Sequence, residues 1–447
     1  MNGGALLAAA ALPVILGLLG GRLAAGLAAP GDGALYRATV YVLGGAVVLH
    51  LVLTLLDFAG LPWSPLLLAA IGAALYLLGW RFLPRGPERA DLAVGFGWGD
   101  GVALCVVAAF TAIALTGWIT FGDFVFHWGL KGERFYLTRG VDYAYLARGW
   151  NWVLHPDYPN LLPEMYATAA LLRGGFDPPA MVLETCAFAA LTLAAVREGL
   201  RQGGADRFTR QTGLALIALV AGAFGIGYVT AGGADWMLAL ALAAAMPPLL
   251  RPPDRTGDFQ IAAIAAFAAA AKIEGVPLAA FLVLAQWARR AWSERRPAIG
   301  AALRLGLPVA AVVLPWLGRA VHHHLLLPSN AGTVEMARAR VVLAAVVESI
   351  RDTGAWHGFL VAAFLPLLLL LPRRTRPFAI VAALQLAFDL YIYFSAPMND
   401  LRYFVLSNFA RLGFQLVPAS LAMALLARDG LADPPAQRGV ETTIARV

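Results

Sequence analysis

The chain of 447 residues contains little lysine and few charged residues of any kind. Charged residues make up 14% of the sequence, and only two of the 34 basic residues are lysines. Both lysines, Lys131 and Lys272, lie in short polar clusters within otherwise apolar sequence. A compact ammonium and a planar guanidinium are not interchangeable. The two lysines therefore mark either functional positions or chance survivals in an arginine-rich chain, and the sequence leaves both readings open.

Cysteine is equally scarce. The only two cysteines, Cys105 and Cys186, fall inside apolar runs, which argues against a disulfide framework and against a thiolate metal site. Short strands of alternating polarity, typical of a membrane barrel, are also absent. The net charge of +7 comes from arginines spread over loops, which indicates membrane topology rather than nucleic-acid binding.

Apolar runs are abundant: the chain is 60% hydrophobic, with a mean hydropathy of +0.71. A run of roughly 18 or more apolar residues can cross a bilayer as a helix. We therefore expect an all-α polytopic membrane protein of about thirteen transmembrane helices. The first run lacks a basic leader and a cleavage site, so it is expected to be a retained span. The predicted spans lie near residues 6–27, 35–56, 66–83, 102–120, 180–200, 213–229, 236–250, 261–271, 276–287, 303–317, 358–371, 379–394 and 405–426.

Arginine-rich loops predict the orientation, because positive charge concentrates on the cytoplasmic side of a membrane protein. With thirteen spans, all of these loops fall on one side, together with the tail from Arg428 onward. That common side supports the count. The loops contain Arg81, Arg85 and Arg89; Arg197, Arg201, Arg207 and Arg210; Arg251 and Arg255; Arg289, Arg290, Arg295 and Arg296; and Arg373, Arg374 and Arg376.

The opposite, extracytoplasmic face collects a different set of ionisable residues. It also carries the longest loop, at about 121–175, whose aromatic residues suit amphipathic helices lying in the membrane interface. The plainer alternative is an aromatic belt with solvated charges. The ionisable residues on this face are Asp123, Lys131, His155, Asp157, Asp235, Lys272, Glu274, His322, Asp400 and Arg402.

Asp123 stands immediately after a predicted span, ahead of His127, Trp128 and Lys131. A carboxylate at the membrane surface can act as a general base or as a metal ligand, because its interactions strengthen in a low dielectric. Helix capping is the structural alternative.

The string from His155 to Pro163, HPDYPNLLP, holds three prolines. Prolines restrict both themselves and the residues before them, so the string predicts a rigid extended turn that fixes the directions of His155 and Asp157. A purely structural corner accounts for the prolines but not for the two polar residues between them.

Asp235 opens a later span, where it acts either as a helix cap or as a site residue. Lys272 and Glu274 sit at the tip of a tight hairpin between short spans. Because residues two apart do not face each other on a helix, we expect them to point at something shared rather than to pair. A metal at His322-His323-His324 is disfavoured, since consecutive side chains diverge.

Arg411 lies inside the last predicted span, and an arginine within the membrane is a functional candidate. Asp389 lies inside the preceding span. Both residues are equally far along the chain from the turn at Asp400, so they are expected at similar depth and can pair.

Together these clusters resemble the GT-C superfamily of integral-membrane glycosyltransferases. The nearest likeness is to the bacterial branch related to protein O-mannosyltransferases and aminoarabinose transferases, and it covers about residues 102–426. In that family an aspartate at the start of the first large extracytoplasmic loop is the catalytic base or a metal ligand, and Asp123 matches it. The other resembling positions are Trp128 and Lys131; the His155–Pro159 string; Ala234 and Asp235; Lys272, Glu274 and Gly275; and Asp400, Leu401, Ser407 and Arg411.

The resemblance implies transfer of a sugar from a polyprenyl-phosphate donor to an extracytoplasmic glycan, lipid or protein, at the outer face of a bacterial cytoplasmic membrane. It implies catalytic roles for Asp123, His155 and Asp157. A divalent metal held by Asp123 and Asp235 is an open element of this expectation. The implied substrate-binding residues are Trp128, Lys131, Lys272, Glu274, Asp400, Arg402 and Arg411.

The limits of the resemblance to the GT-C superfamily suggest how the chain is divided. Residues 1–100 are expected to be accessory transmembrane helices, residues 101–427 the catalytic membrane domain and residues 428–447 a cytoplasmic tail. The helices before the loop depart from the family, whose core starts with the span just before it. Two rivals stay open: a transporter or flippase of lipid-linked sugars, which would place ionisable groups near the midplane, and a non-catalytic subunit of a polysaccharide assembly system.

Overall fold

The computed structural model describes residues 3–23, 27–82, 95–117, 122–295, 298–326, 335–352, 357–370, 375–395 and 400–429. Every regular element within these ranges is helical, which confirms the all-α prediction. The first elements are α1 (Gly3–Leu23), α2 (Ala34–Phe58), α3 (Pro65–Phe82), α4 (Trp98–Leu115), the π-helix η2 (Phe124–Trp128), α5 (Gly129–Thr138), α6 (Tyr143–Leu146), η3 (Gly149–Leu154), α7 (Leu161–Arg173) and α8 (Pro178–Gln202). They are followed by α9 (Arg207–Thr230), α10 (Asp235–Leu250), α11 (Arg255–Ala271), α12 (Gly275–Glu294), α13 (Ile299–His322), η5 (Met336–Arg338), α14 (Ala339–Arg351), η7 (His357–Phe364), α15 (Leu365–Leu368), α16 (Arg376–Ser395) and α17 (Leu401–Asp429).

Eight of the described helices are long and apolar enough to cross a membrane: α2, α3, α4, α8, α9, α13, α16 and α17. Shorter apolar helices occur at Ala11–Leu23, Asp235–Leu250 and Phe359–Leu368. These helices define a multi-pass membrane protein. They do not confirm the count of thirteen spans. The span predicted near 358–371 differs most, because there a 3₁₀ helix, η7, passes into the single turn of α15, with Pro366 in its first turn.

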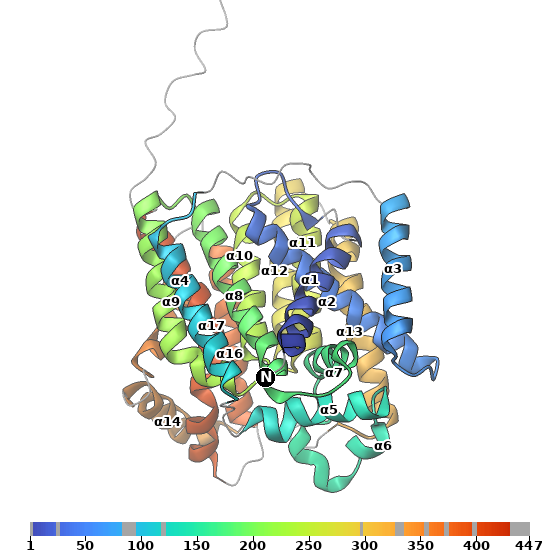
Figure 1. The fold of residues 1–447 in the computed structure, drawn as a ribbon. Helices are drawn as coiled ribbons and strands as arrows, with labels where there is room; N and C mark the ends of the chain where they lie inside the picture. The colour runs from blue at the N-terminus through green and yellow to red at the C-terminus, as the bar shows by residue number, and fades with distance from the viewer. Residues whose placement is uncertain are drawn as a thin grey trace, which may run out of the picture.

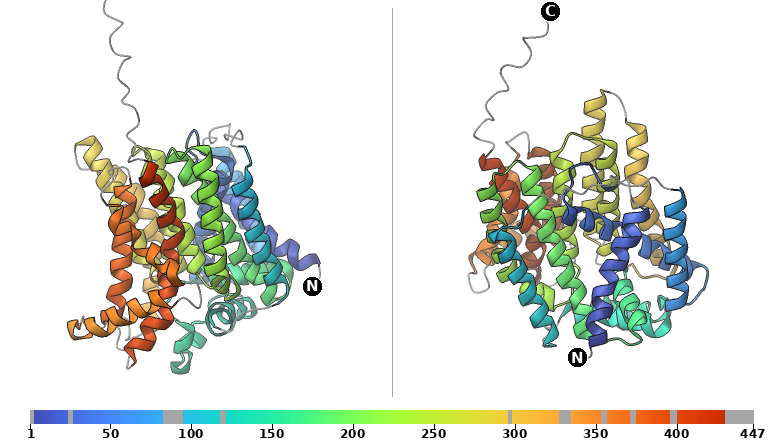
Figure 2. Two further views of the ribbon diagram at one scale, coloured as in Figure 1. Left: turned by 90° about the vertical axis from the view of Figure 1, so that its left-hand side faces the viewer. Right: turned by 45° about the horizontal axis from the view of Figure 1, so that its top comes forward.

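The long helices lie side by side, and the short helices gather at one end of the molecule (Figure 1). That end carries α5, α6, α7 and α14, and the views of Figure 2 agree. Helix α10 lies at the centre, where it packs against α8, α11 and α17. Every residue of α10 from Asp235 to Leu249 is buried. This short helix is apolar on all sides because other helices surround it.

A tight hairpin joins α11 to α12, as the sequence predicted. The backbone is extended at Lys272, with φ −159° and ψ 157°. A Cβ atom on Gly275 would lie 1.8 Å from the carbonyl oxygen of Ala268, so only glycine permits this close approach. The hairpin places Lys272 beside the first residue of α10, Asp235.

The N-terminal helices join the same helical body. Helices α1 and α2 meet closely at glycines. A Cβ atom on Gly20 would lie 1.8 Å from the backbone carbonyl oxygen of Tyr41, and a Cβ atom on Gly45 would lie 2.0 Å from the backbone carbonyl oxygen of Leu16. Such small-residue contacts are typical of helix pairs in membranes. Helix α2 also packs against α7, α8 and α11. Helix α3, in contrast, stands at the edge of the molecule with Gly79 as its only buried residue (Figure 1).

Arginines mark the end of the molecule opposite the short helices. Arg251 follows the last residue of α10 and forms an ion pair of 2.6 Å with buried Asp32. Arg289 and Arg290, near the end of α12, donate to the carbonyl oxygens of Pro248 and Pro253. The predicted loop positions Arg85, Arg89, Arg296, Arg373 and Arg374 lie outside the described residues. Which end faces the cytoplasm remains a prediction from the arginine pattern.

Candidate functional site

A cavity of about 490 Å³ opens at the end of the molecule that carries the short helices. Four segments enclose it: both ends of the 122–160 segment, the hairpin between α11 and α12, the last turns of α16 and the first half of α17. Aromatic side chains form much of its wall, and charged side chains gather at one part of it. Its lining consists of Asp123, His127, Trp152, His155, Tyr158, Lys272, Ile273, Glu274, Phe388, Tyr391, Ile392, Tyr393, Ser395, Phe404, Asn408, Arg411 and Leu412.

Five charged side chains form a continuous chain of alternating sign at this cavity. The guanidinium of Arg411 contacts Asp123 through Nη1 and Nη2 and donates from Nε to Asp235 Oδ2 at 2.7 Å. The ammonium of Lys272 lies 3.2 Å from Asp235 Oδ1 and 3.1 Å from Glu274 Oε1. The order is thus Asp123, Arg411, Asp235, Lys272, Glu274. It joins residues that are up to 288 positions apart in the sequence.

Local structure explains how two of these residues, Asp123 and Asp235, come close together. Asp123 directly precedes the π-helix, and its side chain makes no capping hydrogen bond. Asp235 is the first residue of α10, whose N-cap is Ala234. The capping alternative is therefore wrong for both aspartates. Between them lies Gly233: a Cβ there would lie 3.3 Å from Asp123 Oδ2 and 3.4 Å from Asp235 Oδ2.

Two predictions about pairing were wrong. Asp389 does not pair with Arg411: it accepts a hydrogen bond of 3.0 Å from Gln385, one turn away on α16, while Arg411 points to α10 and Asp123. Lys272 and Glu274 do pair directly. The reason is that they occupy a turn, where the helical spacing rule does not apply.

Two histidines and an aromatic cluster form another wall. The His127 ring stacks on Trp128 with centroids 4.0 Å apart, and the His155 ring lies 4.6 Å from that of Tyr158. His155 adopts φ 46°, the left-handed region. Burial lowers the pKa of His127 well below its usual value and lowers the pKa of His155 to about 4, with nearby cations adding to both shifts. Both imidazoles are therefore neutral at pH 7.

Lys131, Trp128 and Asp157 lie behind this wall rather than in the cavity. Lys131 Nζ donates to the His155 carbonyl oxygen at 3.2 Å and sits 5.3 Å from the Trp128 ring centroid. Burial lowers the pKa of Lys131 to about 7, and the charges of Asp157 and Glu164 oppose the shift. The Trp128 side chain is fully buried, whereas Phe126, Trp150 and Trp152 are exposed aromatic residues of this segment.

Asp400 and Arg402 are not part of the cavity. The Asp400 side chain accepts a hydrogen bond of 2.9 Å from the backbone N–H of Tyr403 and thus caps the start of α17. Arg402 pairs with Glu348 of α14, and both side chains are exposed. Their predicted substrate-binding role rested on sidedness and family likeness, and neither reports which way a side chain points around its helix.

Three polar atoms at the cavity lack a partner within the described part of the chain. His127 Nε2, Glu274 Oε2 and the Tyr393 hydroxyl oxygen are all buried and make no hydrogen bond there, yet all three residues line the cavity. Buried polar groups are nearly always hydrogen-bonded. The three atoms are therefore available to a polar ligand in the cavity.

The residues at the cavity do not fit a divalent metal. Asp123 and Asp235 both direct their carboxylates at Arg411. Among the described residues, no group of three or more His, Cys, Asp and Glu side chains is arranged to hold an ion. A divalent metal ion bound between Asp123 and Asp235, in the place of the Arg411 guanidinium, would need more oxygen ligands than these two carboxylates supply. We therefore assign no chemical step to a metal.

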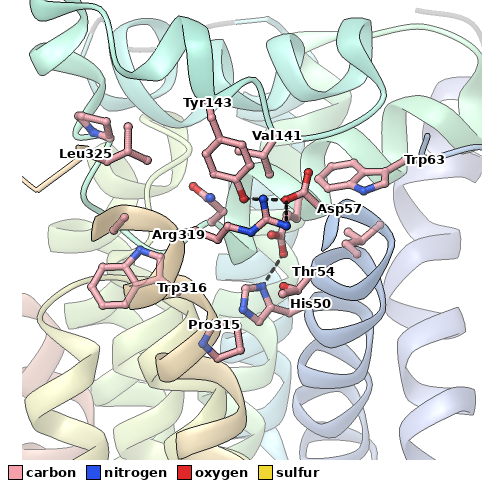
Figure 3. A pocket seen from close by; sticks show the side chains of 15 residues that line it. His50, Thr54, Asp57, Trp63, Val141, Tyr143, Pro315, Trp316, Arg319 and Leu325 are labelled. Atoms are coloured by element: carbon pink, nitrogen blue, oxygen red, sulfur yellow. Dashed lines mark hydrogen bonds and ion pairs between the residues drawn. The ribbon is translucent and has the colours of Figure 1, made fainter. Parts of the chain in front are cut away.

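A second polar cluster escaped the sequence analysis. His50 Nδ1 lies 2.6 Å from Glu164 Oε2, with both side chains buried. Close by, the Tyr143 hydroxyl donates to Asp57 at 2.7 Å, and Arg319 approaches Asp57 at 3.4 Å (Figure 3). These groups line a pocket of about 30 Å³, which has room for about one water. The signal available in the sequence was a histidine within the second apolar run.

The fold and the site together define a class: a polytopic helical membrane protein with a charged, aromatic cavity at one end of its helices. Comparisons of the chain with protein-family models, with curated proteins and with solved structures found no match.

Proposed function

We propose that the protein is a membrane glycosyltransferase that takes a sugar from a polyprenyl-phosphate donor and passes it to an extracytoplasmic acceptor. One observation carries the proposal. Asp123, Lys272 and Arg411 come from three separate segments and line one cavity at the end of the helices, and Asp235 of α10 bridges the two cations from behind it. A structural ion-pair network needs no adjacent cavity of about 490 Å³, whereas a lipid-linked substrate does.

The residues that line the cavity suit the chemistry of each part of such a donor. Arg411 and Lys272 are the cations that can contact the phosphate. Aromatic faces suit the sugar ring, and Tyr158 and Trp152 supply them near the charged residues. The apolar side chains of α16 and α17 offer a path for the polyprenyl chain, because both helices are long and apolar enough to meet lipid.

In the proposed reaction Asp123 is the general base. The acceptor hydroxyl oxygen attacks the anomeric carbon while its proton passes to the Asp123 carboxylate. The bond between the anomeric carbon and the phosphate oxygen breaks, and polyprenyl phosphate leaves with the bonding electron pair. Arg411 and Lys272 stabilise the charge that develops on the phosphate. Direct displacement inverts the anomeric configuration.

The test is transfer by the purified protein in lipid nanodiscs. A panel of polyprenyl-phosphate hexoses and pentoses is supplied with lipid and glycan acceptors, and release of polyprenyl phosphate is measured by mass spectrometry. The proposal predicts release from at least one donor, with inversion in the product. A protein that binds these donors but releases nothing across the panel contradicts the proposal and favours a flippase. A protein that binds none of them favours a non-catalytic subunit.

A further inference from the structure

The alternating chain of charges leaves neither cation at the cavity free. Arg411 has a carboxylate on each side, Asp123 and Asp235. Lys272 likewise lies between Asp235 and Glu274. Asp235 does not line the cavity, whereas the two terminal carboxylates, Asp123 and Glu274, do. An incoming anion therefore meets cations that already hold carboxylates, and it gains a full bidentate contact with one of them by replacing a terminal carboxylate.

The charge balance favours replacement over simple addition. Three carboxylates face two cations, so the chain already carries one negative charge in excess. Adding a phosphate without moving a carboxylate would place further negative charge in a partly buried site, which is costly unless each charge is paired.

Exposure identifies the end at which replacement occurs. The side chains of Arg411 and Asp123 are 20% and 25% exposed, whereas those of Lys272 and Glu274 are 2% and 7% exposed. A guanidinium can hold a phosphate in the same bidentate manner as a carboxylate. The outer pair is therefore the accessible one, and Asp235 retains its bond to Arg411 Nε on the inner side.

We infer that a phosphoryl ligand binds by displacing Asp123 from Arg411, so that ligand binding releases the carboxylate that the proposed function assigns as the base. Arg411 thereby couples binding of the donor to release of the Asp123 carboxylate, which can then act as the base. Without a donor the base stays paired with arginine, which lowers its ability to take a proton from water or from an acceptor that arrives first. This inference rests on the proposed function for the role of Asp123, but the exchange itself is measurable without sugar transfer.

The experiment measures binding of two phosphate probes to the protein in zwitterionic nanodiscs: a short-chain polyprenyl monophosphate and inorganic phosphate. If Asp123 competes with the ligand, Asp123→Asn and Asp123→Ala bind the lipid probe more tightly than the wild type. A factor on the order of tenfold is expected for coupling of this kind. The alanine variant serves in case the asparagine variant does not fold, since the side chain at 123 is partly exposed. Arg411→Gln should weaken binding.

Glu348→Gln is the matched control, because it also frees an arginine, Arg402, but at an exposed pair away from the cavity. Unchanged or weaker lipid-phosphate binding by both Asp123 variants, or equal tightening by Glu348→Gln, overturns the inference. If the Asp123 variants bind inorganic phosphate more tightly but not the polyprenyl monophosphate, the carboxylate exchanges with a free anion, and the assignment of a lipid phosphate as the ligand is overturned. Failure of the wild type and every variant to bind either probe overturns both the inference and the proposed function. Tighter binding by the Asp123 variants, with no sugar transfer by the wild type, supports the exchange and contradicts only the proposed function.

Discussion

Arg411 illustrates what a single residue does in this structure. Its guanidinium is shared between two carboxylates from separate segments, while Asp389 pairs with Gln385. Removing one partner of a buried ion pair costs about 3–5 kcal/mol, because the other charge is left uncompensated.

A double-mutant cycle separates these partners. We expect Asp235→Asn and Arg411→Gln to be strongly coupled in thermal stability, since each removes the other's partner. Asp389→Asn and Arg411→Gln should instead be nearly additive, as for residues that share no contact. The melting temperatures of the single and double variants in detergent measure both couplings. Strong coupling to Asp389 with none to Asp235 would refute the ion-pair arrangement.

Lys131 predicts a pH dependence of stability. Its pKa in the folded protein is lowered by burial to about 7, against about 10.4 for a free lysine side chain. Between these values the unfolded chain binds more protons than the folded one, so the contribution of Lys131 to stability rises with pH and is least favourable below pH 7.

The comparison with Lys131→Met isolates this effect. We expect the difference in melting temperature, wild type minus Lys131→Met, to increase from pH 6.5 to pH 9. Glu348→Gln, an exposed change, should show no such trend. Parallel pH profiles for the wild type and Lys131→Met would show that Lys131 keeps an ordinary pKa.

At the scale of elements, the polar cluster of Figure 3 joins helix α2 to the short helices α6 and α7. His50 contacts Glu164 of α7, and Asp57 contacts Tyr143 of α6. Glu164 in turn acts electrostatically on Lys131, behind the cavity wall. Helix α2 therefore holds α6 and α7 in place.

Tyr143→Phe tests this anchoring. The change removes only the hydroxyl that donates to Asp57, and leaving that partly buried carboxylate without its donor should cost about 1–3 kcal/mol. We expect a lower melting temperature and faster proteolysis near exposed Trp150 and Trp152. Tyr145→Phe is the control, since the described contacts of Tyr145 involve its ring and backbone. Equal effects of the two changes would remove the anchoring role.

The sequence predicted the positions of residues along the membrane normal better than their positions around a helix axis. Residues at span boundaries, such as Asp123, Asp235 and Lys272, were predicted to share one end of the molecule, because apolar length reports position along the membrane normal. Position around a helix axis is not encoded in the same way when helices are apolar on all sides. Arg402 and the buried Lys131 were therefore predicted at the end where the structure has them but not with the surroundings they have there, and Asp389 was assigned the wrong partner.

At the scale of the whole molecule, arginines such as Arg251 and Arg289 gather at one end, and the cavity opens at the other. Positive charge favours the cytoplasmic side, so the cavity is predicted to face outward. Cysteines introduced at Ser293 and at Gly140, in a background lacking Cys105 and Cys186, test the orientation on intact cells. We expect an impermeant thiol reagent to label position 140 but not position 293. The reverse labelling would place the cavity on the cytoplasmic side.

The central claim is that the charged cavity is an active site with Asp123 as its base. Its most direct test is the rate at which purified Asp123→Asn releases polyprenyl phosphate from a sugar donor that the wild type uses, under conditions where donor binding is saturated. Loss of a positioned general base should lower that rate by about 10²–10⁴-fold, while Glu348→Gln remains at the wild-type rate. A near-normal rate for Asp123→Asn would contradict the account.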